Sequence, residues 1–545
     1  MKIPVITYLL QREGSRRLRR VMRGYRFLKE SDKLGKISAV KVTLTNTKLG
    51  LSGLSTSRHI FGAGLKESEL ITRQYLLNSL GWVGLNKALL LALEKSESAV
   101  VYPMPFEWRE VLRQHGFEVD GFRSAAAWYL FNFQMLLKGV LFMAKLTLKC
   151  IKEIISPSVQ PLGKFVYFSD LTAGNLPNDS QKESPDNIIG WYKQWPGRYG
   201  ELETICHSVR GIAPITTGGI PVVSIPYAIP PLIKWTAVIR LVVWGLTASA
   251  LGFIDLFRNR WWHALMFMEA AKGAHARLQC PNKLARFYLM HVSSYIYRPL
   301  WSYEAEKSGS QITCYFYSIN CEPFKRLGKY PPIPFGFQSM NWPHYLVWDE
   351  YQSAFVRSAV GLYPRIDIVG SIPFHSGSEA PQDLPKQAIA VFDVQPMRNA
   401  IYQTLGIDFE YYVPKYSNKF LIDVQHVTEL AGKVMVFKRK RNIGSKLHPS
   451  YEGTIKYLNK KSNCLEIDPD AAAIALIAKC EAVVSVPFTS TAIVGRELGK
   501  PSIYYDPSGI CDKDDRAAHG IPILSGPEEL QKWMMTLVSQ HLFVD

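Results

Sequence analysis

The sequence predicts an α/β protein with two Rossmann-like domains, the first of which carries a helical elaboration. From Lys386 onward, short apolar strands alternate with helices of ordinary length, as in a parallel sheet covered on both faces. The polar, proline-bearing run from His375 to Lys386 separates this part from the rest. A helix-rich block of about 230–305 interrupts the strand-like segments of the first part. We therefore expect an N-terminal domain over 1–384 and a C-terminal domain over 385–545.

The composition is that of a large globular protein with an anionic partner. The chain has 545 residues, of which 47% are hydrophobic, and a formal net charge of +18. Nucleic acid, an anionic membrane or a phosphorylated substrate would satisfy this charge. The sequence shows no nucleic-acid-binding module, which makes nucleic acid the weakest of the three. The eight cysteines are scattered without a C-x-x-C pair, so we expect neither disulfides nor a zinc site, as in a reducing cytosol.

Three segments bear on membranes. Residues 1–20 lack the apolar core and cleavage site of a signal peptide and predict a short strand followed by a basic helix on the cytoplasmic side. The apolar runs Trp128–Cys150 and Leu232–Ile254 are interrupted by lysine and arginine, which are costly near the centre of a membrane span. Buried helices of a large domain explain both runs most simply. Helices lying in the membrane interface, with Trp261 and Trp262 as anchors, and true spans are the alternatives.

The remaining elements of the first part are irregular. We expect strands at 99–102, 164–168, 311–318 and 366–370, a helix over 191–209, and a linker over 218–231 that leads into helices as far as about Tyr303. In the second part the expected strands are 388–394, 434–438, 464–468, 482–486 and 501–506, and the expected helices are 417–431, 451–458, 470–480 and 490–499.

The sharpest functional signal is the turn Pro487-Phe488-Thr489-Ser490-Thr491, where a buried strand meets a helix. Thr489 or Ser490 is placed to cap that helix, and the free N–H groups at its start form an anion site at the carboxyl edge of the sheet. Glu497 follows two turns later on the same face and is a candidate ribose ligand. In the alternative interpretation, the hydroxyls cap a structural helix and Glu497 lies on the surface.

A second signal is the basic run at the end of the strand 434–438. Lys438, Arg439, Lys440 and Arg441 are followed by Lys446 and by His448-Pro449, which opens a helix. Such a run is usually a solvated loop, but here it lies at the edge where open α/β folds bind ligands. Cations and an imidazole there would neutralise a phosphate. Asp393, at the end of the first strand of this domain, is placed to touch the same ligand.

The Pro487-Phe488-Thr489-Ser490 turn, with the following YYDPSG, resembles the signature of bacterial polysaccharide biosynthesis PFTS-motif proteins, and the resemblance covers the part from Lys386 onward best. It implies a GT-B-type glycosyltransferase of capsule or O-antigen biosynthesis. More distantly, His448-Pro449 and the pair Ser490-Thr491 resemble elements of GT-B sialyltransferases and capsule Kdo transferases that hold the donor phosphate. That likeness implies a CMP-activated acidic sugar, a nonulosonate or Kdo, as donor.

Transfer of a sugar needs a general base, for which Glu322 and Asp170 are the candidates because each follows a strand of the N-terminal domain. Asp349 and Glu350 come next. We expect no metal and no cofactor besides the sugar nucleotide, since no D-x-D element follows a strand. The expected partners are a lipid-linked glycan acceptor and the anionic face of the inner membrane, where the protein would be peripheral. The alternatives are a UDP- or GDP-sugar transferase or epimerase, and a non-catalytic polysaccharide assembly protein.

Overall fold

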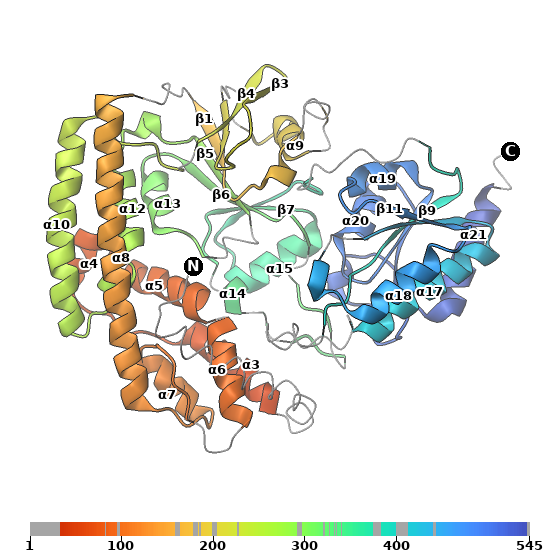
Figure 1. Ribbon diagram of the computed structural model, residues 1–545, viewed down its shortest axis with the longest axis horizontal. Coiled ribbons are helices and arrows are strands. Elements are labelled where there is room, and N and C mark those ends of the chain that lie inside the picture. Colours follow the sequence, from red (N-terminus) through yellow and green to blue (C-terminus); the bar gives the residue numbers. More distant parts are fainter. Residues whose placement is uncertain are drawn as a thin grey trace.

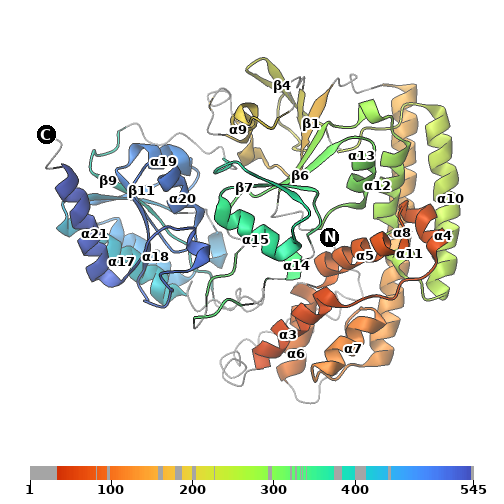
Figure 2. The ribbon, with the colours of Figure 1, turned by 180° about the vertical axis from the view of Figure 1, so that it is seen from behind.

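A computed structural model describes residues 33–541 apart from 82, 95–98, 158–163, 178–183, 185–186, 199–203, 226–227, 292–296, 320–321, 326–327, 332, 334, 339, 374–382, 399–412 and 440–442. Two sheets lie next to each other along the long axis of the molecule, and a layer of helices covers the N-terminal sheet on the side away from the C-terminal one (Figure 1). Figure 2 shows the same order from behind.

The N-terminal sheet contains eight strands among the described residues, in the order β3-β4-β2-β1-β5-β6-β7-β8. All neighbours are parallel except the hairpin of β3 and β4. The chain starts at β1, builds outward through β2 and β4, then returns to β5 on the other side of β1, so β1 and β5 form the switch point of a doubly wound sheet. The strands are β1 Phe165–Phe168, β2 Thr204–His207, β3 Ile215–Thr217, β4 Ile220–Ser224, β5 Phe287–His291, β6 Gln311–Tyr315, β7 His344–Val347 and β8 Arg365–Ile368.

Helices of the N-terminal part fall into two groups. One group forms a block with its own buried apolar core, built before β1 and between β4 and β5. It consists of α3 Lys33–Asn46, α4 Leu54–Phe61, α5 Leu65–Leu80, α6 Val83–Glu94, α7 Phe106–Gln114, α8 Gly121–Ile155, α10 Trp235–Phe257, α11 Trp262–Leu265 and α12 Phe267–Leu278. The other group packs on the sheet and consists of α9 Ile188–Gln194, α13 Leu300–Lys307, α14 Phe335–Gln338 and α15 Glu350–Val360.

The C-terminal sheet has six parallel strands in the described chain, in the order β11-β10-β9-β12-β13-β14. Separate apolar clusters cover its two faces, α17, α18 and α21 on one and α19 and α20 on the other (Figure 1). The elements are β9 Ala388–Phe392, α17 Pro414–Leu430, β10 Val434–Lys438, α18 Pro449–Leu458, β11 Cys464–Ile467, α19 Ala473–Lys479, β12 Ala482–Ser485, α20 Ser490–Glu497, β13 Ser502–Asp506, β14 Ile523–Ser525 and α21 Gly526–His541.

The predicted fold class, two Rossmann-like α/β domains with a helical elaboration of the first, is confirmed by these two strand orders. The elements predicted after Lys386 all form, within a few residues of their expected limits. Strands β8 and β9, which flank the predicted boundary, belong to different sheets.

Several predictions in the first part are wrong. Residues 99–102 form only an isolated bridge between Val100 and Val119. The helix expected over 191–209 stops at Gln194, and Thr204–His207 form the strand β2, whose last three residues are buried in the sheet. The expected linker over 218–231 contains β4, and β5 lies inside the expected helical block. The strand and helix expected over residues 1–20 lie outside the described residues.

The two apolar runs form α8 and α10, which are neither wholly buried nor wholly exposed. Asp120 caps α8 by accepting a hydrogen bond from the Arg123 N–H at 2.9 Å. Of the described helices, α10 is long and apolar enough on its own to cross a membrane, and 33% of its most apolar stretch is buried. Leu65–Leu80 and Gly84–Leu93 pass the same test only together, as a pair bent by 63°. The simplest expectation, buried helices, therefore describes only the inward faces of α8 and α10.

Candidate functional site

The switch point of the C-terminal sheet lies between β9 and β12, because the chain builds outward from β9 through β10 and β11 and then returns to β12. Ligands of doubly wound sheets bind at the carboxyl ends of the strands at this position. The segment that follows β9 carries Asp393 and Gln395, and the segment that follows β12 is the Pro487–Thr491 turn. Predicted ligand-binding residues from distant parts of the sequence are thus brought to one sheet edge.

Asp393 is a buried carboxyl group, 3% exposed. Its Oδ2 accepts a hydrogen bond from the Tyr451 hydroxyl at 2.5 Å, whereas Oδ1 has no partner among the described residues. Burial raises the pKa of Asp393 to about 7, although the Tyr451 hydrogen bond and the charge of Arg439 oppose this shift. Neither the side-chain oxygen nor the nitrogen of the buried Gln395 has a partner in the described chain. Buried polar atoms in this state indicate a polar ligand or water.

His448 lies beside this pair because the loop after β9 runs next to the loop before α18. The His448 N–H donates to the Pro396 carbonyl at 3.0 Å, and Met397 and Leu447 form a bridge. The Ser450 N–H donates to His448 Nδ1 at 3.3 Å, so a neutral imidazole carries its proton on Nε2. Pro449 is the first residue of α18, whose positive end therefore lies next to a potential N–H donor. This arrangement suits a phosphate group.

Two residues of the basic run, which we predicted to bind a phosphate, bind other groups of the protein in the structure. Lys438 is buried and its Nζ donates to the Pro469 carbonyl at 2.8 Å; burial lowers the pKa of this amine. Arg439 is ion-paired with Glu466 of β11 at 2.7 Å. Both side chains therefore join the end of β10 to residues in and just after the neighbouring strand β11. Lys440 lies outside the described residues.

The Pro487–Thr491 turn contacts the other domain. Phe488 has φ 63°, an unusual conformation for an aromatic residue, and its ring stacks on Phe324 of the N-terminal domain at 4.9 Å. The Ser490 hydroxyl accepts a long hydrogen bond, 3.4 Å, from the Ile319 N–H. Phe488 also belongs to the apolar cluster of the N-terminal sheet. The turn is therefore part of the domain interface as well as of the switch point.

Thr489 lies at the expected N-terminal cap position of α20, but the expected capping hydrogen bond is not formed. Its hydroxyl donates to the Val486 carbonyl at 2.8 Å instead of accepting from the helix. The Thr491 hydroxyl is bonded to Ser485 at 2.8 Å. These short-range bonds hold the strained turn in place and leave the first N–H groups of α20 without a side-chain cap.

Glu497 lies at the far end of α20 from the turn, where its carboxylate accepts a hydrogen bond from the Ser371 N–H at 3.0 Å. Ser371 belongs to the segment that leaves β8. In the structure Glu497 therefore contacts the connection between the two sheets, and its role as a ribose ligand stays a prediction.

The switch point of the N-terminal sheet brings together Asp170 and His291. Asp170 follows β1, is partly exposed and has φ 56°, a conformation that asparagine and aspartate adopt more readily than other side-chain-bearing residues. Its backbone carbonyl accepts a hydrogen bond from His291 Nε2 at 3.2 Å. Burial lowers the pKa of His291, so the imidazole is neutral at pH 7, with its basic nitrogen at Nδ1. His291 was not among the predicted site residues, because β5 lies in a segment that the sequence predicted to be helical.

Glu322 and Asp349 both bind cations of the C-terminal domain. Glu322 is 3.1 Å from the guanidinium of Arg516, and burial raises its pKa although Arg516 opposes the shift. Asp349 caps α15 and lies 2.8 Å from His519 and 3.3 Å from Arg496. Burial raises the pKa of Asp349, but the His519 hydrogen bond and the nearby charges outweigh it and leave the pKa below its usual value. We call the group Asp349, His519 and Arg496 the interdomain latch.

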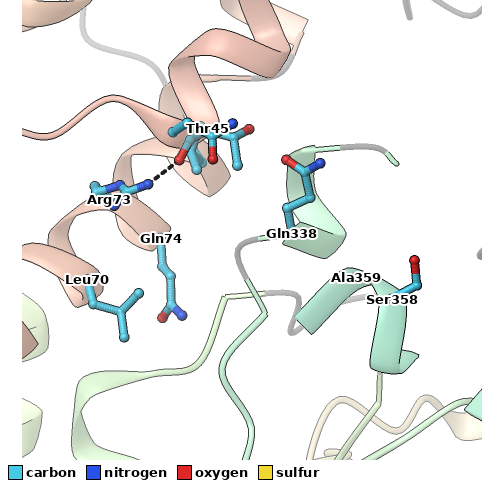
Figure 3. Close-up of a pocket in the computed structure, with 9 residues that line it drawn as sticks. Thr45, Leu70, Arg73, Gln74, Gln338, Ser358 and Ala359 are labelled. Carbon is cyan, nitrogen blue, oxygen red and sulfur yellow. Dashed lines mark hydrogen bonds between the residues drawn. The ribbon is translucent and has the colours of Figure 1, made fainter. Parts of the chain in front are cut away.

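A pocket of about 250 Å³ lies elsewhere, among α3, α5, α14 and α15 (Figure 3). Gln74 is buried there without a hydrogen-bond partner in the described chain, and Arg73 donates to the Thr45 carbonyl. The described residues that line this pocket include no carboxylate that could serve as a general base. Within the described residues, no three His, Cys, Asp or Glu side chains form a group able to hold a metal ion.

Two doubly wound domains whose carboxyl edges meet across an interface define a GT-B-like protein. Residues 244–534, more than half of the chain, match the family described as polysaccharide biosynthesis PFTS motif protein. The chain belongs to this family and is thus a polysaccharide biosynthesis protein on a GT-B scaffold.

Two solved structures are similar to this chain at low sequence identity. An α,α-trehalose-phosphate synthase (UDP-forming) from Burkholderia xenovorans is similar with a TM-score of 0.35 and 11% identity, over 70% of this chain and 93% of the other. UDP-GlcNAc 2-epimerase from Methanocaldococcus jannaschii gives a TM-score of 0.35 and 8% identity, over 69% and 92%. The fold assignment rests on the strand orders rather than on these values. No curated protein matches the chain in sequence.

Proposed function

We propose that the protein is a glycosyltransferase that moves a sugar from a nucleotide-activated donor on the C-terminal domain to a glycan acceptor on the N-terminal domain. The observation that carries this proposal is the group of buried atoms of Asp393 and Gln395 that have no partner among the described residues and lie beside His448, at the switch point of the C-terminal sheet. Asp170 and His291 at the other switch point supply titratable groups for the acceptor hydroxyl. The acceptor is a growing, lipid-linked glycan.

The donor we propose is a CMP-activated acidic sugar, a nonulosonate or Kdo. A single phosphate suits the site, because the Nε2–H of His448 and the start of α18 provide one compact set of donors. Lys438 and Arg439, which could neutralise a second phosphate, are engaged within the protein. A diphosphate would need further cations.

A thermal-shift panel of CMP, UDP and GDP tests the donor class, because a ligand raises the stability of the folded state to which it binds. CMP is expected to raise the melting temperature of the wild type more than UDP or GDP does. His448→Ala should abolish most of this rise, whereas His426→Ala, at an exposed position of α17, should retain it. A shift with UDP alone would contradict the CMP assignment, and an unchanged shift in His448→Ala would contradict the site.

Incubation with a radiolabelled sugar nucleotide separates transfer from the other activities of this scaffold. Transfer requires an acceptor and places the label in a glycan. An epimerase would change the sugar without any acceptor, and a non-catalytic assembly protein would bind the nucleotide without turnover. Either of the last two results would contradict the proposed transfer while leaving the nucleotide site in place.

A further inference from the structure

Helices α8 and α10 form the edge of the molecule opposite the C-terminal sheet (Figures 1 and 2). Their inward faces are tightly packed. A Cβ atom on Gly139 of α8 would lie 2.7 Å from the Phe267 ring of α12, and one on Gly245 of α10 would lie 2.9 Å from Met143 of α8. The two helices are therefore fixed to each other and to the block behind them.

The outward faces of both helices are apolar. On α8, most of the large exposed side chains are three, four or seven residues apart, which places them along one stripe. They are Phe122, Tyr129, Leu130, Phe133, Leu137, Leu141, Leu148 and Ile155. On α10 the corresponding residues are Trp235, Ile239, Val243, Leu246, Phe253, Ile254 and Phe257, with Leu246 69% exposed. An apolar surface that extends over two helices is unusual for a soluble monomer and marks an interaction site.

The charges exposed on these two helices are all positive. Lys138, Lys145 and Lys152 lie on α8 next to the apolar stripe, and Arg240 lies on the outward face of α10. The acidic residues of the two helices, Glu153 and Asp255, are buried, and Asp255 binds His263 at 2.8 Å and Arg260 at 3.3 Å. The occupant of this surface must therefore be apolar and anionic. A second copy of the same surface would bring like charges together.

We propose that α8 and α10 dock the protein on an anionic phospholipid surface, with both helices lying in the plane of the membrane interface. Thirty-five residues make α8 about 52 Å long, which exceeds the hydrocarbon thickness of about 30 Å. Its exposed lysines are spread along the second half of the helix, where their heads reach the phosphates while the leucines enter the acyl region. This docking does not depend on the proposed function.

Co-sedimentation with vesicles tests the proposal. The wild-type protein should bind vesicles of phosphatidylglycerol and phosphatidylcholine but not of phosphatidylcholine alone, and binding should weaken as salt rises. The triple variant Lys138→Glu, Lys145→Glu, Lys152→Glu should bind at least about tenfold more weakly. The double variant Leu141→Gln, Leu246→Gln should also bind more weakly, since it removes apolar contacts without changing the charge.

A control with the same charge change is Lys456→Glu, Lys460→Glu, Lys532→Glu on the C-terminal domain, which should bind like the wild type. The altered side chains are all exposed, so circular dichroism and the melting temperature should stay unchanged. Equal binding of the wild type to neutral vesicles, or of the triple α8 variant and the wild type to anionic ones, would overturn the proposal. Extraction from cell membranes by detergent only would also overturn the proposal, in favour of a membrane span. A dimer that forms without lipid and is lost in Leu141→Gln, Leu246→Gln would overturn it in favour of a second copy of the chain.

Discussion

The carboxyl group of Asp393 is held near its neutral form because the interior of the sheet edge disfavours its charge. Its pKa of about 7 lies well above that of an aspartate in an unfolded chain, about 3.9. The folded state therefore binds a proton that the unfolded state has lost. Stability from this group is fully present at low pH and falls as the pH rises from about 4 to about 7.

Asp393→Asn should remove this part of the pH dependence. Urea unfolding of the C-terminal domain at pH 5 and pH 7 should show a smaller loss of stability in the variant than in the wild type, by up to roughly 1.4 kcal/mol per pH unit. The exposed Asp383→Asn serves as the control and should retain the wild-type slope. An unchanged slope in Asp393→Asn would mean that this carboxyl group is ionised throughout.

Asp170 is the better of the two predicted general bases, because it is partly exposed at a switch point, whereas Glu322 is paired with Arg516. Asp170→Asn should lower turnover by about 10²–10⁴-fold and leave donor affinity unchanged, since the donor lies on the other domain. Turnover and nucleotide binding must be measured separately. Glu322→Gln should change turnover only together with domain stability. If Asp170→Asn turns over within a few-fold of the wild type, His291 or Glu322 must be tested as the base.

At the scale of the element, α20 is positioned by a close approach to the strands beneath it. A Cβ atom on Gly495 would lie 2.6 Å from Val483 Cγ2 of β12 and would also meet the Ser502 hydroxyl. Gly495→Ala should therefore push the helix away from the sheet, lower stability by about 1–3 kcal/mol and weaken nucleotide binding at the turn. Urea unfolding and the thermal-shift panel measure both effects.

Gly453 in α18 offers a control of opposite sign. Apart from the two chain neighbours and the backbone of its own helix, no atom of the described chain lies within 4 Å of a Cβ built on this exposed helical glycine. Gly453→Ala should raise stability by about 0.5–1 kcal/mol, because alanine loses less backbone freedom in a helix. If both glycine variants stabilise the protein, the packing of α20 on β12 is looser than the structure indicates.

At the scale of the whole molecule, the interdomain latch joins the two domains through Asp349 and His519, which are shielded from water, and through Arg496, which is exposed. Asp349→Asn removes the negative charge next to Arg496 and a hydrogen-bonding oxygen next to the buried His519, and should weaken the interface by about 1–3 kcal/mol. Calorimetry should then show the melting transitions of the two domains further apart. Because the pKa of Asp349 is lowered, the wild-type latch is present above about pH 4 and is lost as the pH falls below it.

Asp367→Asn is a matched control for the latch. Asp367 also binds a histidine and an arginine, His344 at 3.0 Å and Arg365 at 2.7 Å, but all three residues belong to the N-terminal sheet. This variant should change the stability of the N-terminal domain without separating it from its neighbour. Equal separation in the two variants would show that the latch has no specific role between the domains.

Local sequence patterns determined the C-terminal domain almost completely. Alternation of apolar strands and helices, with Gly499 and Pro501 as breaks, is encoded within about ten residues at a time and needs no distant partner. The same patterns placed Asp393, His448 and the Pro487–Thr491 turn at strand ends, and parallel strands bring such ends to one edge. In the N-terminal part, where helices and short strands mix without a regular period, β2, β3, β4, β5 and β7 were missed.

Only the tertiary structure determined which of these side chains are available to bind a ligand. The sequence predicted Lys438 and Arg439 to be phosphate ligands. In the structure they bind acceptors in and just after β11, about thirty residues further along the chain. Phe488 and Asp349 meet partners in the other domain, and the apolar stripe of α8 is left outside because α10 and α12 cover only one side of that helix. The sequence determines where a chain bends and which residues follow a strand. Contacts between distant segments depend on the packing of whole domains, and that packing determines each residue's partner and the water around it.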